Sequence, residues 1–245
     1  MKTVLIATHQ ISFSDADSFH NCLGVLTLSA ALKARNLDCE ALNLVEYNKL
    51  YTRDCDEVLN SIVEKILAAR PDILGFSAMI NNLAVALELA ARVKKIRPEV
   101  HIVFGGPGTA FCAKDVLSNF PQVDIIFRVE CDFVFPDFVA SVKMGRPDYS
   151  IKGMIYKNAS DITDNGWPDP VENLDDLPIP DFAFDESPAA SQDSATFGDY
   201  NGVSIETGRG CPFTCNFCST SIYFKRKYRL KSVARVISEI VHIRD

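Results

Sequence analysis

The chain has 245 residues, of which 47% are hydrophobic and 23% are charged, and its formal net charge is −7. This composition is typical of a globular protein with a sizeable core and excludes a disordered chain. The acidic balance argues against a broad basic face for nucleic acid. The apolar start, Met1–Ala7, is too short for a signal peptide or a membrane anchor. We therefore expect a cytoplasmic protein that binds neither membrane nor nucleic acid.

The first 145 residues alternate short β-branched runs with longer helical patterns. This alternation predicts a parallel sheet with helices on both faces. The expected strands are Thr3–Ala7, Cys39–Leu44, Pro71–Ser77, Val100–Phe104 and Val123–Phe127. The expected helices are Leu23–Ala34, Val58–Ala69, Leu83–Ile96 and Phe133–Val142. Right-handed crossovers then make a five-stranded, doubly wound α/β sheet of the flavodoxin-like type.

In such a sheet, ligands bind beyond the carboxyl ends of the strands, where the strand order reverses. The residues of interest are therefore those that directly follow strands: Thr8–Gln10, Ser77–Met79 and Gly105–Gly108. Glycine lets a backbone come close to a ligand and accepts positive φ, so Gly105, Gly106 and Gly108 are candidates for ligand contact. A tight turn after a strand explains the same loop, which lacks the G-x-G-x-x-G spacing of a dinucleotide site.

The character of the chain changes after residue 145. Ile151–Lys157 is predicted to be a short strand or hairpin arm, and four prolines among acidic residues in Asn165–Pro180 indicate an extended segment. We expect a domain over residues 1–145, a linker over residues 146–200 and a second region over residues 201–245.

The second region contains one predicted strand at Gly202–Glu206, a cysteine loop and one predicted helix at Val233–Ile243. A single strand and helix cannot bury their own apolar face, so this domain is expected to be incomplete. The basic run Lys225–Lys231 is interpreted as a solvated loop or helix entry rather than an RNA-binding patch.

The eight cysteines fall into two groups. Five are scattered singly and are predicted to be small buried hydrophobes: Cys22, Cys39, Cys55, Cys112 and Cys131. The other three, Cys211, Cys215 and Cys218, have the spacing C-x3-C-x2-C, which suits a soft metal or an iron–sulfur cluster. A structural zinc usually needs four protein ligands, and no fourth cysteine follows. The spacing therefore favours a [4Fe–4S] cluster with one open iron over a zinc site or a redox pair.

The loop Gly208–Cys218, with Phe217 in the aromatic position, resembles the C-x3-C-x-aromatic-C signature of the radical SAM enzymes. The flanking segments Ile205–Pro212 and Arg229–Ser232 fit the same family. The resemblance implies that Cys211, Cys215 and Cys218 hold the cluster, that its open iron binds S-adenosylmethionine, and that Phe217 packs near the adenine. It also implies formation of a 5′-deoxyadenosyl radical with an electron from a flavodoxin or ferredoxin.

The upstream part resembles the cobalamin-binding domain that precedes the barrel in one radical SAM subgroup. The matching segments are Asp72–Ser77, Val103–Gly108, Val123–Phe127 with Glu130, and Leu174–Asp181. This resemblance implies cobalamin contacts from Ser77, Gly105, Gly106, Gly108 and Glu130. Two departures concern Val129–Asp132, where relatives often have Gly-Glu-Gly-Glu, and Asp17–His20 with Gly24, which only approximates Asp-x-His-x-x-Gly. A cobalt-ligand role for His20 is therefore not expected.

The expected function is that of a cobalamin-dependent radical SAM enzyme, acting by methyl transfer or rearrangement on an unreactive centre of a small molecule or peptide. The region over residues 201–245 would be the first βα unit of a radical SAM barrel. Because a barrel needs several more such units, the chain is expected to be an N-terminal fragment or a truncated gene product. The open alternatives are a non-catalytic cobalamin- or metal-binding module and a zinc-stabilised interaction protein.

Overall fold

The computed structural model describes residues 1–7, 22–44, 55–128, 130–158, 161–182 and 204–244. The strands are β1 (Thr3–Ala7), β2 (Cys39–Asn43), β3 (Ile73–Ser77), β4 (His101–Gly105), β5 (Ile125–Phe127), β6 (Met154–Asn158), β7 (Asp161–Asp164), β8 (Gly208–Gly210) and β9 (Tyr228–Leu230). The helices are α1 (Leu23–Lys33), α2 (Cys55–Ala68), α3 (Leu83–Ile96), α4 (Pro107–Ala110), α5 (Ala113–Asn119), α6 (Val134–Lys143), α7 (Ser219–Tyr223) and α8 (Val233–Arg244), with a 3-10 turn, η2, at Leu174–Asp176.

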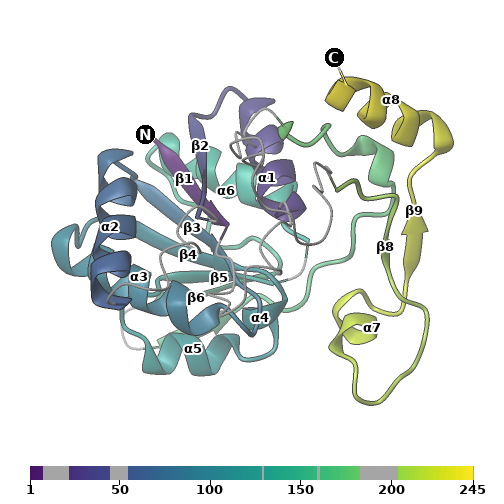
Figure 1. The fold of residues 1–245 in the computed structure, drawn as a ribbon. Coiled ribbons are helices and arrows are strands. Elements are labelled where there is room, and N and C mark those ends of the chain that lie inside the picture. Colours follow the sequence, from purple (N-terminus) through teal and green to yellow (C-terminus); the bar gives the residue numbers. More distant parts are fainter. Residues whose placement is uncertain (8–21, 45–54, 129, 159–160, 183–203, 245) are drawn as a thin grey trace.

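The larger sheet has seven strands in the order β2-β1-β3-β4-β5-β6-β7 (Figure 1). Its first five members pair in parallel, which confirms the predicted parallel core. The prediction of only five strands was wrong, because β6 and β7 add two antiparallel strands beyond β5. Pairing Ile126 with Ile155 covers the β5 edge, which would otherwise expose unpaired backbone groups. The hairpin arm predicted at Ile151–Lys157 is thus part of the sheet.

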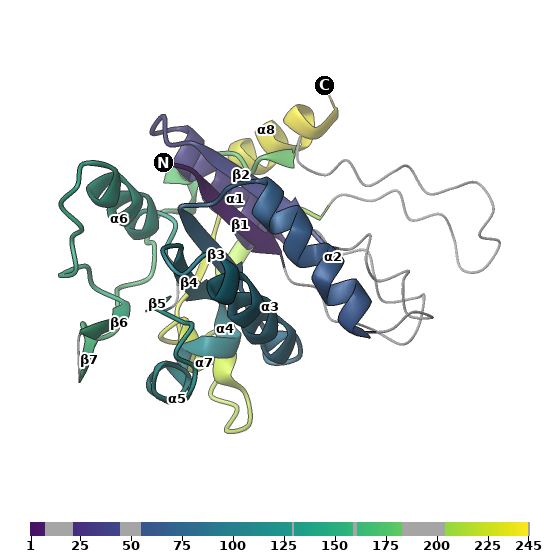
Figure 2. The same cartoon turned by 90° about the vertical axis from the view of Figure 1, so that its left-hand side faces the viewer.

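The two faces of the sheet are covered by different helices because successive side chains of a strand point in opposite directions. Val4 and Ile6 of β1 pack into the core beneath α2, α3 and α5. Leu5 and Ala7 pack into the second core with α1 and α6. Figure 2 shows the result: α2 and α3 lie on the opposite side of the sheet from α6. Buried on both faces, β1 reads as a continuous apolar run.

The predicted helices agree with α1, α2, α3 and α6 to within a few residues. The short helices α4 and α5 were not predicted. Pro107 at the start of α4 has a backbone shape suited to a first helical turn. The turn before it needs Gly106, whose φ is +91° and whose added Cβ would lie 2.5 Å from the Ala78 carbonyl oxygen. Glycine here serves a close approach between two loops of the protein itself.

The residues after the large sheet form a hairpin and two helices along one side of the body (Figure 1). β8 pairs with β9 in antiparallel fashion. Of the strand predicted at Gly202–Glu206, positions 202 and 203 lie outside the described residues, and positions 204–206 are not strand. The strand instead begins at Gly208, directly before the cysteine loop.

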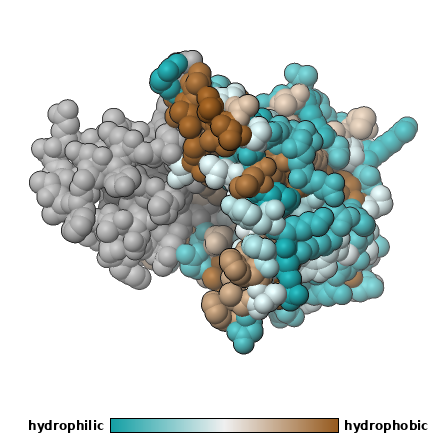
Figure 3. Space-filling model, turned by 90° about the vertical axis from the view of Figure 1, so that its right-hand side faces the viewer, coloured by the Kyte–Doolittle hydropathy of each residue, from teal (hydrophilic) through white to brown (hydrophobic). Residues whose placement is uncertain are grey.

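Helix α8 turns a charged side toward the protein and an apolar side outward. Glu239 is 1% exposed, and its carboxylate accepts hydrogen bonds from Lys231 Nζ at 2.7 Å and Arg235 Nε at 2.8 Å. The expectation that Lys225–Lys231 is solvated was therefore wrong for Lys231, which is buried by this pairing, and for Arg229, whose side chain is 9% exposed and paired with Glu130. The apolar surface over α8 is visible in Figure 3, and its exposed residues are Val233, Ile237, Ile240 and Val241. Among the described residues, no helix combines the length and apolarity that a membrane span requires.

Candidate functional site: an apolar pocket and a cysteine loop

An apolar pocket opens at the carboxyl ends of the parallel strands, on the face covered by α1 and α6. It holds about 390 Å³ of space, including the part open to solvent. Its lining comes from four strands, two helices and the turns after β4 and β5: Leu5, Val25, Leu28, Gly75, Phe76, Ser77, Val103, Phe104, Gly105, Gly106, Phe127, Cys131 and Phe135. The strand order reverses around β1 and β3, so the pocket lies where doubly wound sheets bind ligands.

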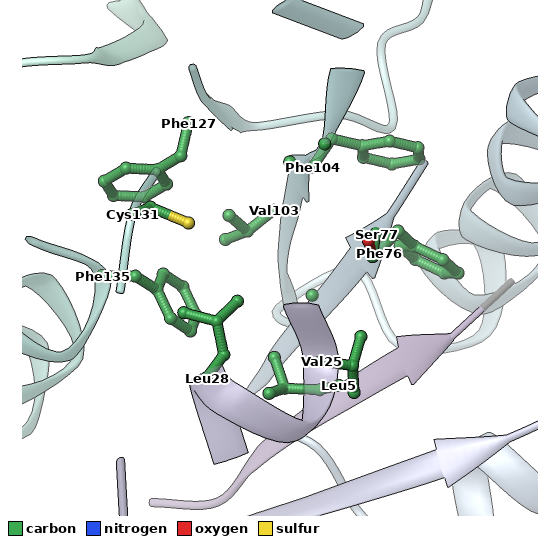
Figure 4. A pocket seen from close by; sticks show the side chains of 13 residues that line it. Leu5, Val25, Leu28, Phe76, Ser77, Val103, Phe104, Phe127, Cys131 and Phe135 are labelled. Atoms are coloured by element: carbon green, nitrogen blue, oxygen red, sulfur yellow. The ribbon is translucent and has the colours of Figure 1, made fainter. Parts of the chain in front are cut away.

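Three side chains form one wall of the pocket in Figure 4: Phe127, Cys131 and Phe135, with Val103 beside Cys131. The rings of Phe127 and Phe135 meet edge to face, with centroids 5.6 Å apart. Burial raises the pKa of the Cys131 thiol well above its ordinary range, so the thiol is neutral. This wall suits an apolar or aromatic ligand group and offers no charge to it.

Ser77 supplies a hydroxyl at the end of β3, where the sequence predicted a site residue. The Cys22 thiol donates to Ser77 Oγ at 3.6 Å, which links the start of α1 to this strand end. Phe76, next to Ser77, contributes little more than backbone, because its ring stacks on Phe104 at 5.0 Å within the opposite core. Ser77 is therefore a polar group in a largely apolar hollow, a pattern that orients a ligand.

The glycine loop after β4 divides between the pocket and the protein's own packing. Gly105 and Gly106 line the pocket, whereas Gly108 is not among its lining residues. The Gly108 N–H donates to the Ala78 carbonyl at 2.9 Å, and a Cβ on Gly108 would lie 2.5 Å from the carbonyl carbon of Met79. Gly108 thus lets the turns after β3 and β4 pack together beside the pocket.

Glu130 lies outside the pocket lining and points toward the β8–β9 hairpin. Its carboxylate accepts from Arg229 Nη1 at 2.7 Å, from Arg229 Nη2 at 3.0 Å and from the Val171 N–H at 2.8 Å. The side chain is 4% exposed. The cobalamin contact expected of Glu130 from the sequence stays a prediction, and the described partners of its carboxylate are Arg209, Arg229 and Val171.

Arg209 was not singled out from the sequence, although it is buried beside the same turn. Its guanidinium donates to Asp132 at 2.8 Å, to Glu206 at 2.7 Å and to Glu130 at 3.3 Å. Burial opposes its charge, but Asp132 and Glu206 outweigh that effect and raise the pKa of Arg209. The sequence signal for this role was the position of Arg209 between two glycines, Gly208 and Gly210. Glycines allow two strands to pair closely, and the long side chain between them can then contact a distant segment.

The cysteine loop follows β8 and ends at α7. Cys215 is exposed, and Cys211 and Cys218 are partly exposed, so the three thiols are accessible to solvent. Hydrogen bonds from the Thr220 side chain and backbone lower the pKa of Cys218, which favours the thiolate. Phe217 is 88% exposed. The donor chemistry suits an iron–sulfur cluster, yet in the described part of the chain no three His, Cys, Asp or Glu side chains are gathered closely enough to hold a metal ion.

Aromatic contacts attach α7 to the body of the protein. Tyr223 is 6% exposed and lies 6.5 Å from Phe111, whose ring is in turn 5.3 Å from Trp167. Arg128 stacks over Trp167 at 4.9 Å. The loop is therefore held at both ends, by Arg209 before the first cysteine and by Tyr223 after the last one.

The single cysteines do not all behave as predicted. Cys55 is exposed at the start of α2, so its interpretation as a buried hydrophobe was wrong. Cys131 lines the pocket, while Cys39 and Cys112 pack partly buried against the two cores. The segment Thr8–Gln10 and the residue His20 lie outside the described residues.

Residues 13–138, half of the chain, match the B12 binding domain family. An uncharacterized methyltransferase of Pyrococcus horikoshii is 32% identical over 186 residues, which cover 76% of this chain and 39% of that protein. The cobalamin-dependent radical SAM methyltransferase TokK of Streptomyces tokunonensis is 26% identical over 163 residues, covering 66% of this chain and 23% of that protein.

Two solved structures share the fold over 99% of this chain. OxsB, a cobalamin-dependent S-adenosylmethionine radical enzyme with aqua-cobalamin bound, has a TM-score of 0.74 at 19% identity, and 32% of it is covered. TsrM from Kitasatospora setae, a radical S-adenosylmethionine methyltransferase with cobalamin and a [4Fe-4S] cluster bound, has a TM-score of 0.68 at 15% identity, and 46% of it is covered. The chain spans less than half the length of each of these proteins. The chain belongs to the B12-binding domain family, and the proteins it is similar to include cobalamin-dependent radical SAM proteins.

Proposed function

We propose that the apolar pocket holds the nucleotide tail of cobalamin and that the chain acts in cobalamin-dependent radical SAM chemistry. The observation that carries the proposal is a hollow of aromatic and aliphatic side chains at the carboxyl ends of β3, β4 and β5, within a B12-binding domain. Phe127 and Phe135 would cover one face of a flat ring, and the Ser77 hydroxyl would orient it. Gly105 and Gly106 would pass along its edge.

The cysteine loop supports the second half of the proposal. Cys211, Cys215 and Cys218 would hold a [4Fe–4S] cluster once the loop closes around it, with Phe217 covering S-adenosylmethionine. These cofactors would supply an adenosyl radical and a methyl-carrying cobalt centre, for methyl transfer to, or rearrangement of, an unreactive carbon or phosphorus. The protein's own part is to position the groups and to exclude water.

The exposed side of α8 supports a barrel as the setting of the loop. Val233, Ile237 and Ile240 lie at helical spacing on one face, and each is about half exposed or more. Further βα units would cover such a face. The relatives are more than twice as long as the matched part, so they contain polypeptide for those units.

Titration with hydroxocobalamin tests the pocket. We expect saturable binding that is weakened about tenfold or more in Leu28→Trp, because the larger ring fills the hollow from α1. Ile96→Trp is the matched control, since Ile96 is 57% exposed on α3, on the opposite face of the sheet. The proposal fails if the wild-type chain does not bind, or if both variants bind as the wild type does.

Anaerobic reconstitution with iron and sulfide tests the loop. We expect broad visible absorbance from thiolate-to-iron charge transfer, lost in Cys215→Ala and kept in Cys55→Ala, whose thiol is also exposed. A colourless product that binds one zinc through the same cysteines would instead favour a zinc-stabilised interaction protein. Cobalamin binding without any cluster would leave a non-catalytic cobalamin module.

A further inference from the structure

Two arginines lie directly opposite each other on the β8–β9 hairpin. Arg209 and Arg229 are register partners across the antiparallel pair. Like charges at such positions are destabilising, and a hairpin of two short strands is marginal by itself. The hairpin therefore depends on a countercharge outside it.

The countercharge comes from the turn between β5 and α6. Glu130 and Asp132 have side chains that are 4% and 7% exposed, and each of the two arginines is 9% exposed. We call these four residues the arginine–acid clamp. Glu206 adds a third carboxylate by accepting from Arg209 Nε at 2.7 Å. Removing one member of so buried a set leaves its partner charged and unsolvated, so loss of any one of these side chains is expected to be costly.

The residue between the two acids is Cys131, whose side chain forms part of the pocket wall (Figure 4). The clamp thus holds one end of the pocket wall and, two residues before Cys211, one end of the cysteine loop. A displacement of the hairpin would move Glu130 and Asp132, and with them the thiol that faces the ligand space.

From this arrangement we infer that Arg209 is a positioning residue that sets the shape of the apolar pocket from outside it. Contact between the hairpin and the β5–α6 turn is needed to keep Cys131 in the pocket lining. The position of the cysteine loop and the shape of the pocket are therefore coupled. The inference rests on the proposed function in that cobalamin is the probe of the pocket. By reciprocity, whatever stabilises the docked hairpin also strengthens binding in the pocket.

Hydroxocobalamin affinity is the first measurement, made on the full chain. Arg209→Met is expected to weaken binding about fivefold or more, within the ordinary range of coupling between sites, and Arg209→Lys to restore part of the loss. Arg235→Met is the matched control, because Arg235 also pairs with a buried acid but lies on α8. If Arg209→Met is folded by circular dichroism and binds as tightly as the wild type, the inference is overturned.

The double variant Asp132→Asn/Arg209→Met replaces the single variant in this measurement if Arg209→Met does not fold. It removes the Asp132 charge that Arg209→Met leaves buried and without its partner. This double variant is also expected to bind more weakly than the wild type, and wild-type affinity in it would overturn the inference.

The fluorescence of Trp167 is the second measurement and does not involve cobalamin. It is the only tryptophan of the chain and lies beside Arg128 and Phe111, where α7 meets the body. Undocking in Arg209→Met is expected to shift its emission to the red, while Arg235→Met leaves it unchanged. If the wild type fails to bind cobalamin, the proposed function falls, and the emission shift still decides whether Arg209 docks the hairpin.

Discussion

Single residues decide how closely the segments of this protein can approach one another, and Gly210 is the clearest case. Its φ is +99°, and an added Cβ would lie 1.9 Å from the Lys227 carbonyl oxygen. Gly208 is under a similar limit, with an added Cβ 2.7 Å from the Arg229 carbonyl oxygen. The glycines on either side of Arg209 are thus required by the close antiparallel pairing of β8 and β9.

Replacing Gly210 by alanine should therefore destabilise the protein more than the strain of a positive φ alone would, because the new Cβ also meets the Lys227 carbonyl oxygen. Gly145→Ala is the control, because Gly145 has φ +72° but no atom near an added Cβ. We expect Gly145→Ala to lower the free energy of unfolding by about 1–2 kcal/mol and Gly210→Ala to lower it further. Urea unfolding followed by Trp167 fluorescence measures both, and equal losses would contradict this account of the hairpin.

In the last part of the chain, β8, β9 and α8 are held largely by buried charge, whereas α7 is held by aromatic contacts. Lys231, just after β9, is 2% exposed in its side chain, and Glu239 on α8 is 1% exposed. Asp175 of η2 accepts from the Ser232 N–H at 2.9 Å, which ties the start of α8 to the extended segment. The orientation of α8 follows from these contacts.

Loss of the Glu239 carboxylate should destabilise α8 strongly. Glu239→Leu leaves the buried Lys231 ammonium without its acceptor, at a cost of about 3–5 kcal/mol. Glu88→Ala, which breaks an exposed pair with Arg92, should cost less than about 1 kcal/mol. Hydrogen exchange of the α8 amides and urea unfolding distinguish the two. Similar effects from both substitutions would show that burial of the Lys231–Glu239 pair is unimportant.

The molecule as a whole buries thiols that stay neutral at an alkaline pH at which the same thiols would ionise in the unfolded chain. Burial raises the pKa of Cys39 from 9.0 to about 12, and it also raises the pKa of Cys131 and of Tyr223. Such groups ionise more easily in the unfolded chain than in the folded one. Their contribution is therefore fully present below about pH 9 and is lost as the pH rises toward 12.

Alkaline pH should accordingly destabilise the folded protein, and Cys39→Ala should make the free energy of unfolding fall less steeply with pH. We expect the free energy of unfolding to fall between about pH 9 and about pH 11 under reducing conditions, and to fall less in Cys39→Ala. Cys55→Ala is the control, because that thiol is exposed. Superimposable curves of unfolding free energy against pH for the wild type and Cys39→Ala would show that Cys39 does not contribute to the alkaline loss of stability.

Much of the fold was predictable because local pattern and burial agree there. β1, β3 and β4 are short apolar runs, and α3 has apolar residues at helical spacing ended by Arg97. The placement of Ser77 and Gly105 at the pocket could also be predicted, because both residues end strands and the carboxyl ends of parallel strands meet at one edge of the sheet. The roles of Glu130, Arg209 and Arg229 could not be predicted, because the ion pairs that join the turn after β5 to the hairpin connect residues 77 to 99 positions apart in the chain.

The sequence by itself determined the parallel core, the three cysteines at cluster spacing and the positions of the strand-end residues, since each of these depends on neighbours in the chain. Tertiary structure decided the addition of β6 and β7, the burial of Lys231 and the engagement of Glu130 by the hairpin. Those features depend on which buried charge or open strand edge finds a partner from a distant segment. Pairing of that kind is set by the free energy of desolvation in the folded molecule and leaves little trace in local pattern.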